Sequence, residues 1–76
     1  MEKPFPLSEL KVGQQATVAA LLTSGAMRRR LQDLGIVSGT RVLCAFGSPS
    51  GDPMAYEVRG SLVAIRRNDA KTILIN

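Results

Sequence analysis

Few side chains in this sequence could carry out chemistry. There is no histidine among its 76 residues, so a serine, histidine and acid triad cannot be assembled. No glycine-rich phosphate loop ends in Gly-Lys-Ser or Gly-Lys-Thr, so GTP is not bound through that motif. We therefore expect no catalytic residues, and the protein is predicted not to be an enzyme.

The acidic residues and the cysteine are the candidate metal ligands. Transition metals need imidazole, carboxylate or thiolate ligands that converge in one pocket. No two acidic residues are spaced three or four apart, as two ligands on one helix face would be, and none are spaced as adjacent strand ligands. The sequence therefore predicts no metal site and no cofactor. The acidic residues are Glu2, Glu9, Asp33, Asp52, Glu57 and Asp69.

Basic residues are the most prominent charged feature. Ten lysines and arginines against six acidic residues give a formal net charge of +4, and Arg28, Arg29 and Arg30 are consecutive. Such a charge favours an acidic protein surface, a nucleic acid or anionic lipid headgroups as a partner. Charge does not choose among these partners.

Length and composition predict a single domain, residues 1–76, with a thin, mainly aliphatic core. A lone cysteine, Cys44, indicates a reducing compartment, and the N-terminus has no apolar run typical of a signal peptide. The longest apolar stretch, residues 18–22, is far below the roughly 20 residues that cross a bilayer. We expect a cytoplasmic protein that reaches a membrane only through a partner.

The first half of the sequence predicts a strand followed by a helix. Residues 15–22 alternate, with Ala16, Val18, Ala20 and Leu22 on one buried face. Thr23 and Ser24 offer helix N-cap chemistry, and residues 25–34 carry an apolar stripe at i, i+4 and i+7. Gly35 is expected to end this helix in a left-handed conformation, with the next residue packing back on the helix. The stripe consists of Met27, Leu31 and Leu34.

Three further strands are predicted in the second half, over residues 40–46, 54–59 and 62–66, with a last run over 71–75. In the first of them Val42, Cys44 and Phe46 share a face, so Cys44 and Phe46 are predicted to be buried, as is Tyr56. Residues 47–53 are rich in turn formers and predict an exposed hairpin loop. Gly39 marks a turn, and Gly60 with Ser61 fits a type II′ turn.

These elements predict a mainly β fold: a small SH3-like barrel of about five strands with a short helix between the first two. The barrel shape follows because a sheet of this size must curl to bury its apolar faces and limit open edges. Gly35, Gly39 and Gly60 are interpreted as structural turn residues, since each position needs a positive φ or a close approach.

The motifs at residues 7–13, 28–40, 51–60 and 64–70 together resemble the FeoA domain family. Residues 7–13 resemble its opening L-x-x-L-x-x-G pattern, and residues 28–40 are similar to its R-R-L-x-x-L-G-[ILM]-x-x-G-x helix and turn. Residues 51–60 and 64–70 follow its G-D-P-x-x-[YF]-x-[VL]-R-G and closing x-[LI]-R-x-x-[DE]-A patterns. The resemblance covers nearly the whole sequence.

This resemblance implies a cytosolic accessory protein of bacterial ferrous iron uptake. Its expected partner is FeoB, a membrane iron transporter with a cytoplasmic GTP-binding domain, which it would modulate or assemble. Three interpretations of Arg28, Arg29 and Arg30 remain open: a solvated helix face, a docking surface, and an arginine supplied to the GTP-binding domain of the partner. Leu21, Leu43 and Val63, on strand faces opposite the expected core, are candidates for docking or for a homo-oligomer contact.

Two rival functions share the predicted fold. The basic composition is compatible with a nucleic-acid-binding barrel, but such proteins stack bases on exposed aromatic rings, and we assign Phe46 and Tyr56 to the core, so no nucleic acid is expected. The second rival is a stand-alone interaction module related to the C-terminal domain of metal-dependent repressors. The sequence lacks the DNA-binding domain that precedes this module in a repressor.

Overall fold

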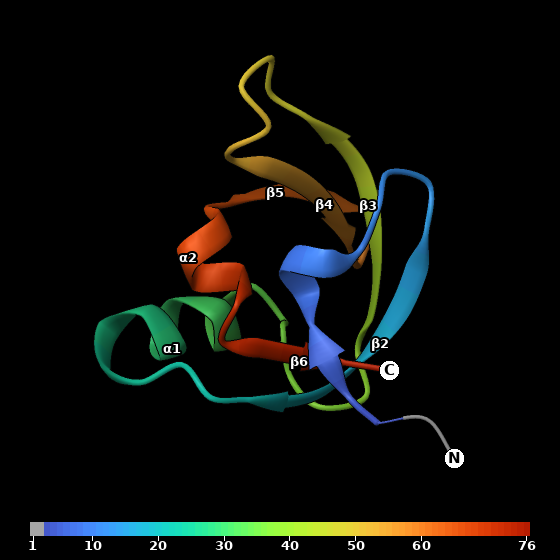
Figure 1. Cartoon of the computed structure of the whole chain (residues 1–76). Helices are drawn as coiled ribbons and strands as arrows, with labels where there is room; N and C mark the ends of the chain where they lie inside the picture. Colours follow the sequence, from blue (N-terminus) through green and yellow to red (C-terminus); the bar gives the residue numbers. More distant parts are fainter. Residues whose placement is uncertain (1–2) are drawn as a thin grey trace.

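The computed structural model describes residues 3–76 and shows a mainly β chain (Figure 1). Glu2, one of the acidic residues considered above, lies outside the described residues. Within residues 3–76 one antiparallel sheet has six strands in the order β1-β6-β2-β3-β4-β5, so the expectation of about five strands is one too low. The elements are β1 (Phe5–Pro6), the 3₁₀ helix η1 (Leu7–Glu9), β2 (Gln15–Leu21), α1 (Gly25–Asp33), β3 (Arg41–Gly47), β4 (Met54–Val58), β5 (Ser61–Ile65), α2 (Arg67–Ala70) and β6 (Ile73–Ile75).

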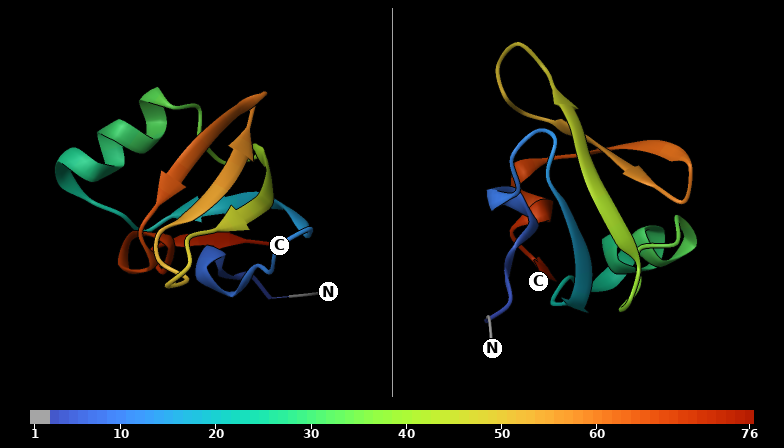
Figure 2. Two further views of the ribbon diagram at one scale, coloured as in Figure 1. Left: turned by 90° about the horizontal axis from the view of Figure 1, so that it is seen from above. Right: turned by 90° about the vertical axis from the view of Figure 1, so that its right-hand side faces the viewer.

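β2 is the strand at which the sheet turns. Its first half pairs with β3 and its second half pairs with β6, so the sheet curls around one interior (Figure 2). A register shift between Val18 and Ala20 interrupts the alternation. Beyond it Leu21 packs against the core, whereas Leu22 is 63% exposed. The predicted buried face is therefore wrong at the end of this strand, because a bulge moves the following side chains to the opposite face.

A second bulge lies in β3, between Cys44 and Phe46. Before it Val42 and Cys44 are fully buried, as predicted, but Phe46 is 54% exposed. The extra residue turns the Phe46 side chain outward, so its assignment to the core is wrong. Tyr56, opposite Cys44 on β4, is 1% exposed, and its assignment to the core is confirmed.

The helix α1 ends as the sequence predicts. The N–H of Ile36 donates to the carbonyl of Leu31 at 2.9 Å, the N–H of Gly35 donates to Gln32 at 2.9 Å, and Gly35 has a φ of +89°. These two bonds define a Schellman ending. At the other end Ser24 is the N-cap residue, within the predicted pair, but its side chain makes no cap hydrogen bond.

Three short elements escaped the sequence analysis: β1, the 3₁₀ helix η1 and the helix α2. β1 pairs with β6, so α1 lies between the second and third strands and not between the first two. The four-residue helix α2 begins where the N–H of Arg67 donates to Asp52 Oδ1 at 2.9 Å. Residues 47–53 are therefore not only an exposed loop, because Asp52 ties them to the start of α2.

The β4–β5 turn differs by one residue from the prediction. Val58 pairs with Ser61, which leaves Arg59 and Gly60 as the two loop residues. Both have a positive φ, of 53° and 82°, as a type I′ turn requires, so the expected type II′ turn at Gly60 and Ser61 is wrong. Gly39 has a φ of +94° in a tight turn, the left-handed conformation that favours glycine.

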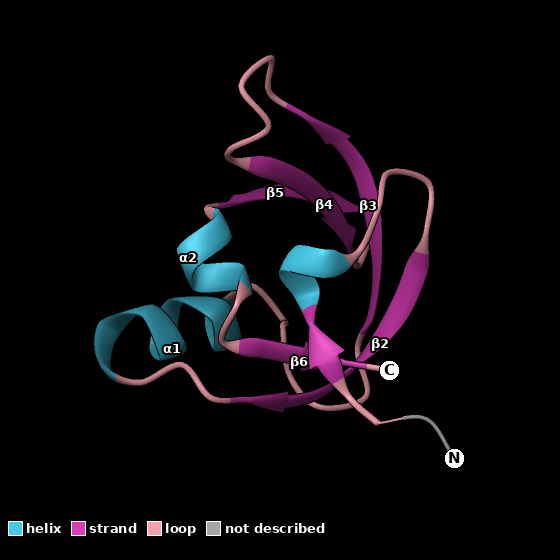
Figure 3. Cartoon of the chain, in the orientation of Figure 1, coloured by secondary structure: helices cyan, strands magenta, loops and turns pink. Residues whose placement is uncertain are grey.

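The core fills the inside of the curled sheet and is built mainly from aliphatic side chains. The α-helices α1 and α2 both lie on the left of the molecule in the view of Figure 3. Neither has the length and apolar composition that a helix within residues 3–76 would need to span a bilayer. The buried apolar residues are Leu7, Leu10, Val18, Leu31, Ile36, Val42, Cys44, Tyr56, Val58, Ile65, Ala70, Ile73 and Ile75.

Candidate functional site

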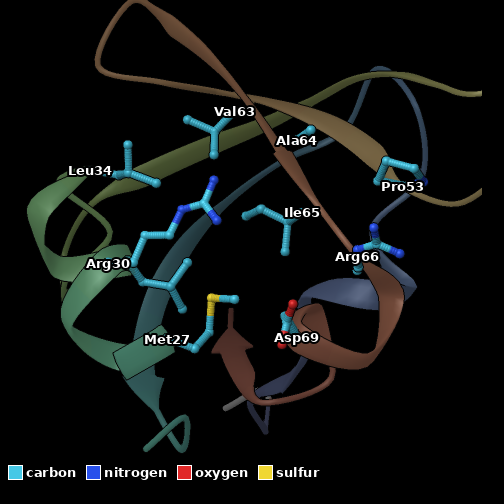
Figure 4. Close-up of a pocket in the computed structure, with 10 residues that line it drawn as sticks. Met27, Arg30, Leu34, Pro53, Val63, Ala64, Ile65, Arg66 and Asp69 are labelled. Atoms are coloured by element: carbon cyan, nitrogen blue, oxygen red, sulfur yellow. The ribbon is translucent and has the colours of Figure 1, made fainter. Parts of the chain in front are cut away.

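A cleft of about 280 Å³ lies between α1, β5 and α2 (Figure 4). This volume is slightly below the roughly 300 to 1,000 Å³ of small-molecule sites, so it suits one or two side chains of a partner better than a cofactor. Two other hollows are larger: one of about 550 Å³ is lined in part by Tyr56, and one of about 430 Å³ in part by Arg59. We consider the smaller cleft because it contains a predicted partner-binding residue, Arg30. It is lined by Met27, Arg30, Leu31, Leu34, Pro53, Val63, Ala64, Ile65, Arg66 and Asp69.

One face of α1 forms a wall of the cleft. Met27, Arg30, Leu31 and Leu34 lie at i, i+3, i+4 and i+7, and residues at this spacing share one helix face. Leu31 is 2% exposed and fixes the helix to the core, a burial worth roughly 1.5 to 3 kcal/mol. Leu34, 38% exposed, stands at the rim.

Gly35 and Arg59 hold the end of α1 against the β4–β5 turn. A Cβ atom built on Gly35 would lie 2.8 Å from Cδ of Arg59 and 2.9 Å from its Nε. The arginine stem therefore packs directly on the glycine, and no larger residue fits without a shift.

The opposite wall comes from β5 and from the residues around α2. Val63 and Ile65 contribute apolar side chains, and Ile65 is only 4% exposed. Pro53 reaches the same cleft because the neighbouring Asp52 caps the N–H of Arg67. Val63, expected on an outer face, instead packs against the core and lines the cleft.

The three consecutive arginines do not form one surface. Successive helix residues are about 100° apart, so three of them point in three directions. Arg28 Nη1 donates to the carbonyl oxygens of Leu21 at 2.7 Å and Thr23 at 3.3 Å, and so ties α1 to the end of β2. Arg29 is exposed, and Arg30 extends into the cleft toward Val63 (Figure 4). Arg30 is the member of the run that the structure brings into the candidate site.

The two predicted docking leucines lie apart from the cleft. Leu21 packs against the core, so its expected position on an exposed face is wrong. Leu43 is half-buried on β3, opposite Gln15 and Glu57. Glu57 in turn pairs with Leu62, which is 58% exposed, so the outer side of β3–β5 carries an apolar side chain that the sequence analysis did not single out.

The candidate metal ligands and Cys44 lie as follows in the described residues. Within residues 3–76 no three histidine, cysteine or acidic side chains gather as a metal site would need. Cys44 is fully buried, as predicted, and burial raises the pKa of its thiol. Burial, and to a lesser extent the nearby Cys44, raises the pKa of Tyr56 to about 12. Both side chains are therefore neutral at pH 7.

Comparisons with known proteins agree with the fold. The family model described as FeoA domain matches residues 5–76. A Fe(2+) transport protein A/Fe(2+) transporter FeoB fusion protein of Porphyromonas gingivalis is 34% identical over 67 residues, which cover 88% of this chain. The chain spans only 8% of the length of that relative.

The solved structures that are similar over most of the chain include two FeoA proteins. The FeoA protein of Chlorobium tepidum is 40% identical with a TM-score of 0.90, over 95% of this chain and 69% of that one. The FeoA of Stenotrophomonas maltophilia, described as a procaryotic SH3 domain protein and complexed there with zinc, is 30% identical with a TM-score of 0.85, over 95% and 89%.

The curled sheet with its inserted helix and lateral cleft defines a small SH3-like β domain. The chain belongs to the FeoA domain family. This family consists of non-enzymatic accessory domains associated with ferrous iron transport.

Proposed function

We propose that this chain is a cytoplasmic accessory protein of ferrous iron uptake that binds the FeoB transporter and modulates or assembles it. The observation that carries the proposal is the Porphyromonas gingivalis relative, in which a similar sequence is fused to FeoB. Fusion holds two modules at a high effective concentration, so it is of use where the modules act on each other. Such an action requires a surface of this domain that contacts the transporter.

The cleft between α1 and β5 is the surface we assign to this docking. Its apolar lining gives a partner side chain a place to bury, and the guanidinium of Arg30 gives it a charged group to contact. A charged hydrogen bond from an arginine fork to a carboxylate is directional as well as strong. Arg28 contributes indirectly, because its bonds to Leu21 and Thr23 hold the start of α1 in place.

The test is to mix the purified protein with the soluble GTP-binding domain of FeoB and with detergent-solubilised FeoB, and to record binding and GTP hydrolysis. We expect binding to at least one form. Arg30→Ala should weaken it about five- to tenfold, that is by about 1 to 1.4 kcal/mol. The matched control is Arg29→Ala, which removes the same charge one residue away and outside the cleft.

The outcomes separate the possible roles. Faster GTP turnover on binding identifies an activator, and unchanged turnover identifies an assembly factor. Loss of the GTPase effect with retained binding in Arg30→Ala would point to an arginine acting on the nucleotide. If the wild-type protein bound neither form, the proposal would be wrong.

Nucleic-acid binding is a second candidate because Phe46 is exposed. One exposed ring is less than the series of aromatic platforms on which single-strand binders stack successive bases. Tyr56 does not add to it, being buried. Salt-dependent binding of an oligonucleotide below micromolar concentration, lost in Phe46→Ala, would favour this candidate over the transporter.

A further inference from the structure

β5 is the last strand of the sheet, so only one of its edges is paired. In the two-residue hairpin Val58 and Ser61 form the first hydrogen-bonded pair, and such pairs recur at every second position. The backbone groups of Ser61, Val63 and Ile65 therefore face β4. Those of Leu62 and Ala64 face the other edge, where the part of the chain that the structure describes provides no neighbouring strand.

This free edge opens into the cleft described above. Val63, Ala64 and Ile65 all line the cleft, although successive strand residues point to opposite faces of a sheet. Both faces can line one cleft only if it runs along the edge of the strand. Across the gap stand Met27 and Leu34 of α1, so an added strand would place alternate side chains against apolar surface (Figure 4).

Positive charge surrounds the same edge. Arg59 lies in the turn before β5, Arg66 directly follows β5, and Arg30 enters from α1. Asp69 is the single acidic residue among those lining the cleft in the described part of the chain. An extended segment with carboxylates beside an apolar side chain would match this arrangement.

A second copy of this chain matches it poorly. Symmetric antiparallel pairing of two β5 strands about Val63 would bring Arg59, in the turn before β5 of one copy, near Arg66 and Arg67, which follow β5 in the other copy. Like charges brought close together across a strand pair are destabilising. Self-pairing is therefore disfavoured at both ends of the strand, whereas an acidic segment is favoured at both.

We propose that an extended segment of a partner, with an apolar residue flanked by acidic ones, adds as a further strand to the free edge of β5. The N–H and C=O groups of Leu62 and Ala64 pair with the segment. Its apolar side chain occupies the cleft, and its carboxylates meet Arg30 and Arg66. The inference rests on the proposed function, because the segment is taken to belong to the cytoplasmic part of the transporter.

The first test uses backbone chemistry at one position. Ala64→Pro removes the outward N–H and leaves the β4 pairing intact, since proline is tolerated at a strand edge. Ala64→Thr keeps the N–H at the same site and is the matched control. Binding of the FeoB soluble domain should fall at least tenfold in Ala64→Pro and change less than about threefold in Ala64→Thr. A nuclear magnetic resonance spectrum of each variant checks that the fold is retained.

A second measurement does not depend on any variant folding. In the isotope-labelled wild-type protein, amide exchange at Leu62 and Ala64 should slow on binding of the FeoB soluble domain.

Arg30→Glu should weaken binding more than Lys11→Glu, which makes the same charge change at an exposed residue outside the cleft.

The outcomes are distinguishable from failure of the proposed function. If FeoB binds but the two amides exchange as before, the inference is wrong while the transporter remains the partner. If FeoB does not bind, a peptide of alternating glutamate and leucine tests the edge alone: selective shifts at Leu62 and Ala64 support strand addition, and their absence overturns it. Shifts of these amides that grow with protein concentration would show self-pairing and would also overturn the inference.

Discussion

Replacement of Gly35 by alanine tests how the end of α1 is built. Gly35 has a φ of +89°, a region that costs an L-residue roughly 1 to 2 kcal/mol. The new Cβ would also lie 2.8 Å from Cδ of Arg59. That atom belongs to a long, exposed side chain that can swing away, so the contact should add only about 0.5 kcal/mol.

The matched control is Gly39→Ala. Gly39 has a φ of +94°, but nothing lies within 4 Å of an added Cβ. Both variants should therefore lose about 1 to 2 kcal/mol of unfolding free energy, and Gly35→Ala should lose a few tenths more than Gly39→Ala. In a domain of this size each kcal/mol lowers the melting temperature by roughly 4 to 8 °C. Urea unfolding followed by circular dichroism gives the free energies.

Two results would refute this reasoning. Losses below about 0.5 kcal/mol in both variants would show that the left-handed backbone is not costly at these positions. A loss above about 3 kcal/mol in Gly35→Ala, unrelieved when Arg59→Ala is added, would show that the side chain is not what the new methyl group meets.

Three further predictions concern the core. Leu31→Ala should cost about 2 to 5 kcal/mol in urea unfolding, because Leu31 is 2% exposed, whereas Leu62→Ala, at a 58% exposed position, should cost less than about 0.5. The Cys44 thiol, buried and with a raised pKa, should react with a thiol reagent at pH 8 only as fast as the protein opens; a rapid native-state reaction would contradict this. Tyr56 is the one tyrosine of the sequence, so absorbance of its phenolate reports its pKa directly, expected at about 12 against a model-peptide value of 10.0. Because folding raises this pKa, the stability linked to the neutral phenol is fully present below pH 10 and is lost as the pH rises toward 12. The loss should be about 2 to 3 kcal/mol relative to Tyr56→Phe. Equal pH dependence of stability in the two proteins would contradict the raised pKa.

Local sequence patterns determined much of the fold. The helix over residues 25–34 and its ending at Gly35 follow from an apolar stripe and one glycine, and both are confirmed to within one residue. The alternating segments gave four strands and the last run near the C-terminus, and these too lie where expected. Such features depend on residues a few positions apart, so a sequence records them directly.

The bulges show where local patterns stop being sufficient. Whether a strand continues its alternation depends on the register of its neighbours, and β2 and β3 each meet two different strands. That register turned Leu21 inward and Phe46 outward. The helix α2 was missed for a related reason: four residues carry little periodicity, and its start is capped by Asp52, 15 positions earlier.

The candidate site was decided by the tertiary structure. The sequence indicated that residues 28–30 are basic, but not that Arg28 binds backbone carbonyls while Arg30 enters a cleft. It also gave no sign that β5 would be the last strand, with Leu62 and Ala64 facing a free edge. Composition and short-range spacing set the elements, the charge and the family. The cleft and its open edge arise because segments some 35 positions apart become neighbours, and only long-range pairing determines which ones do.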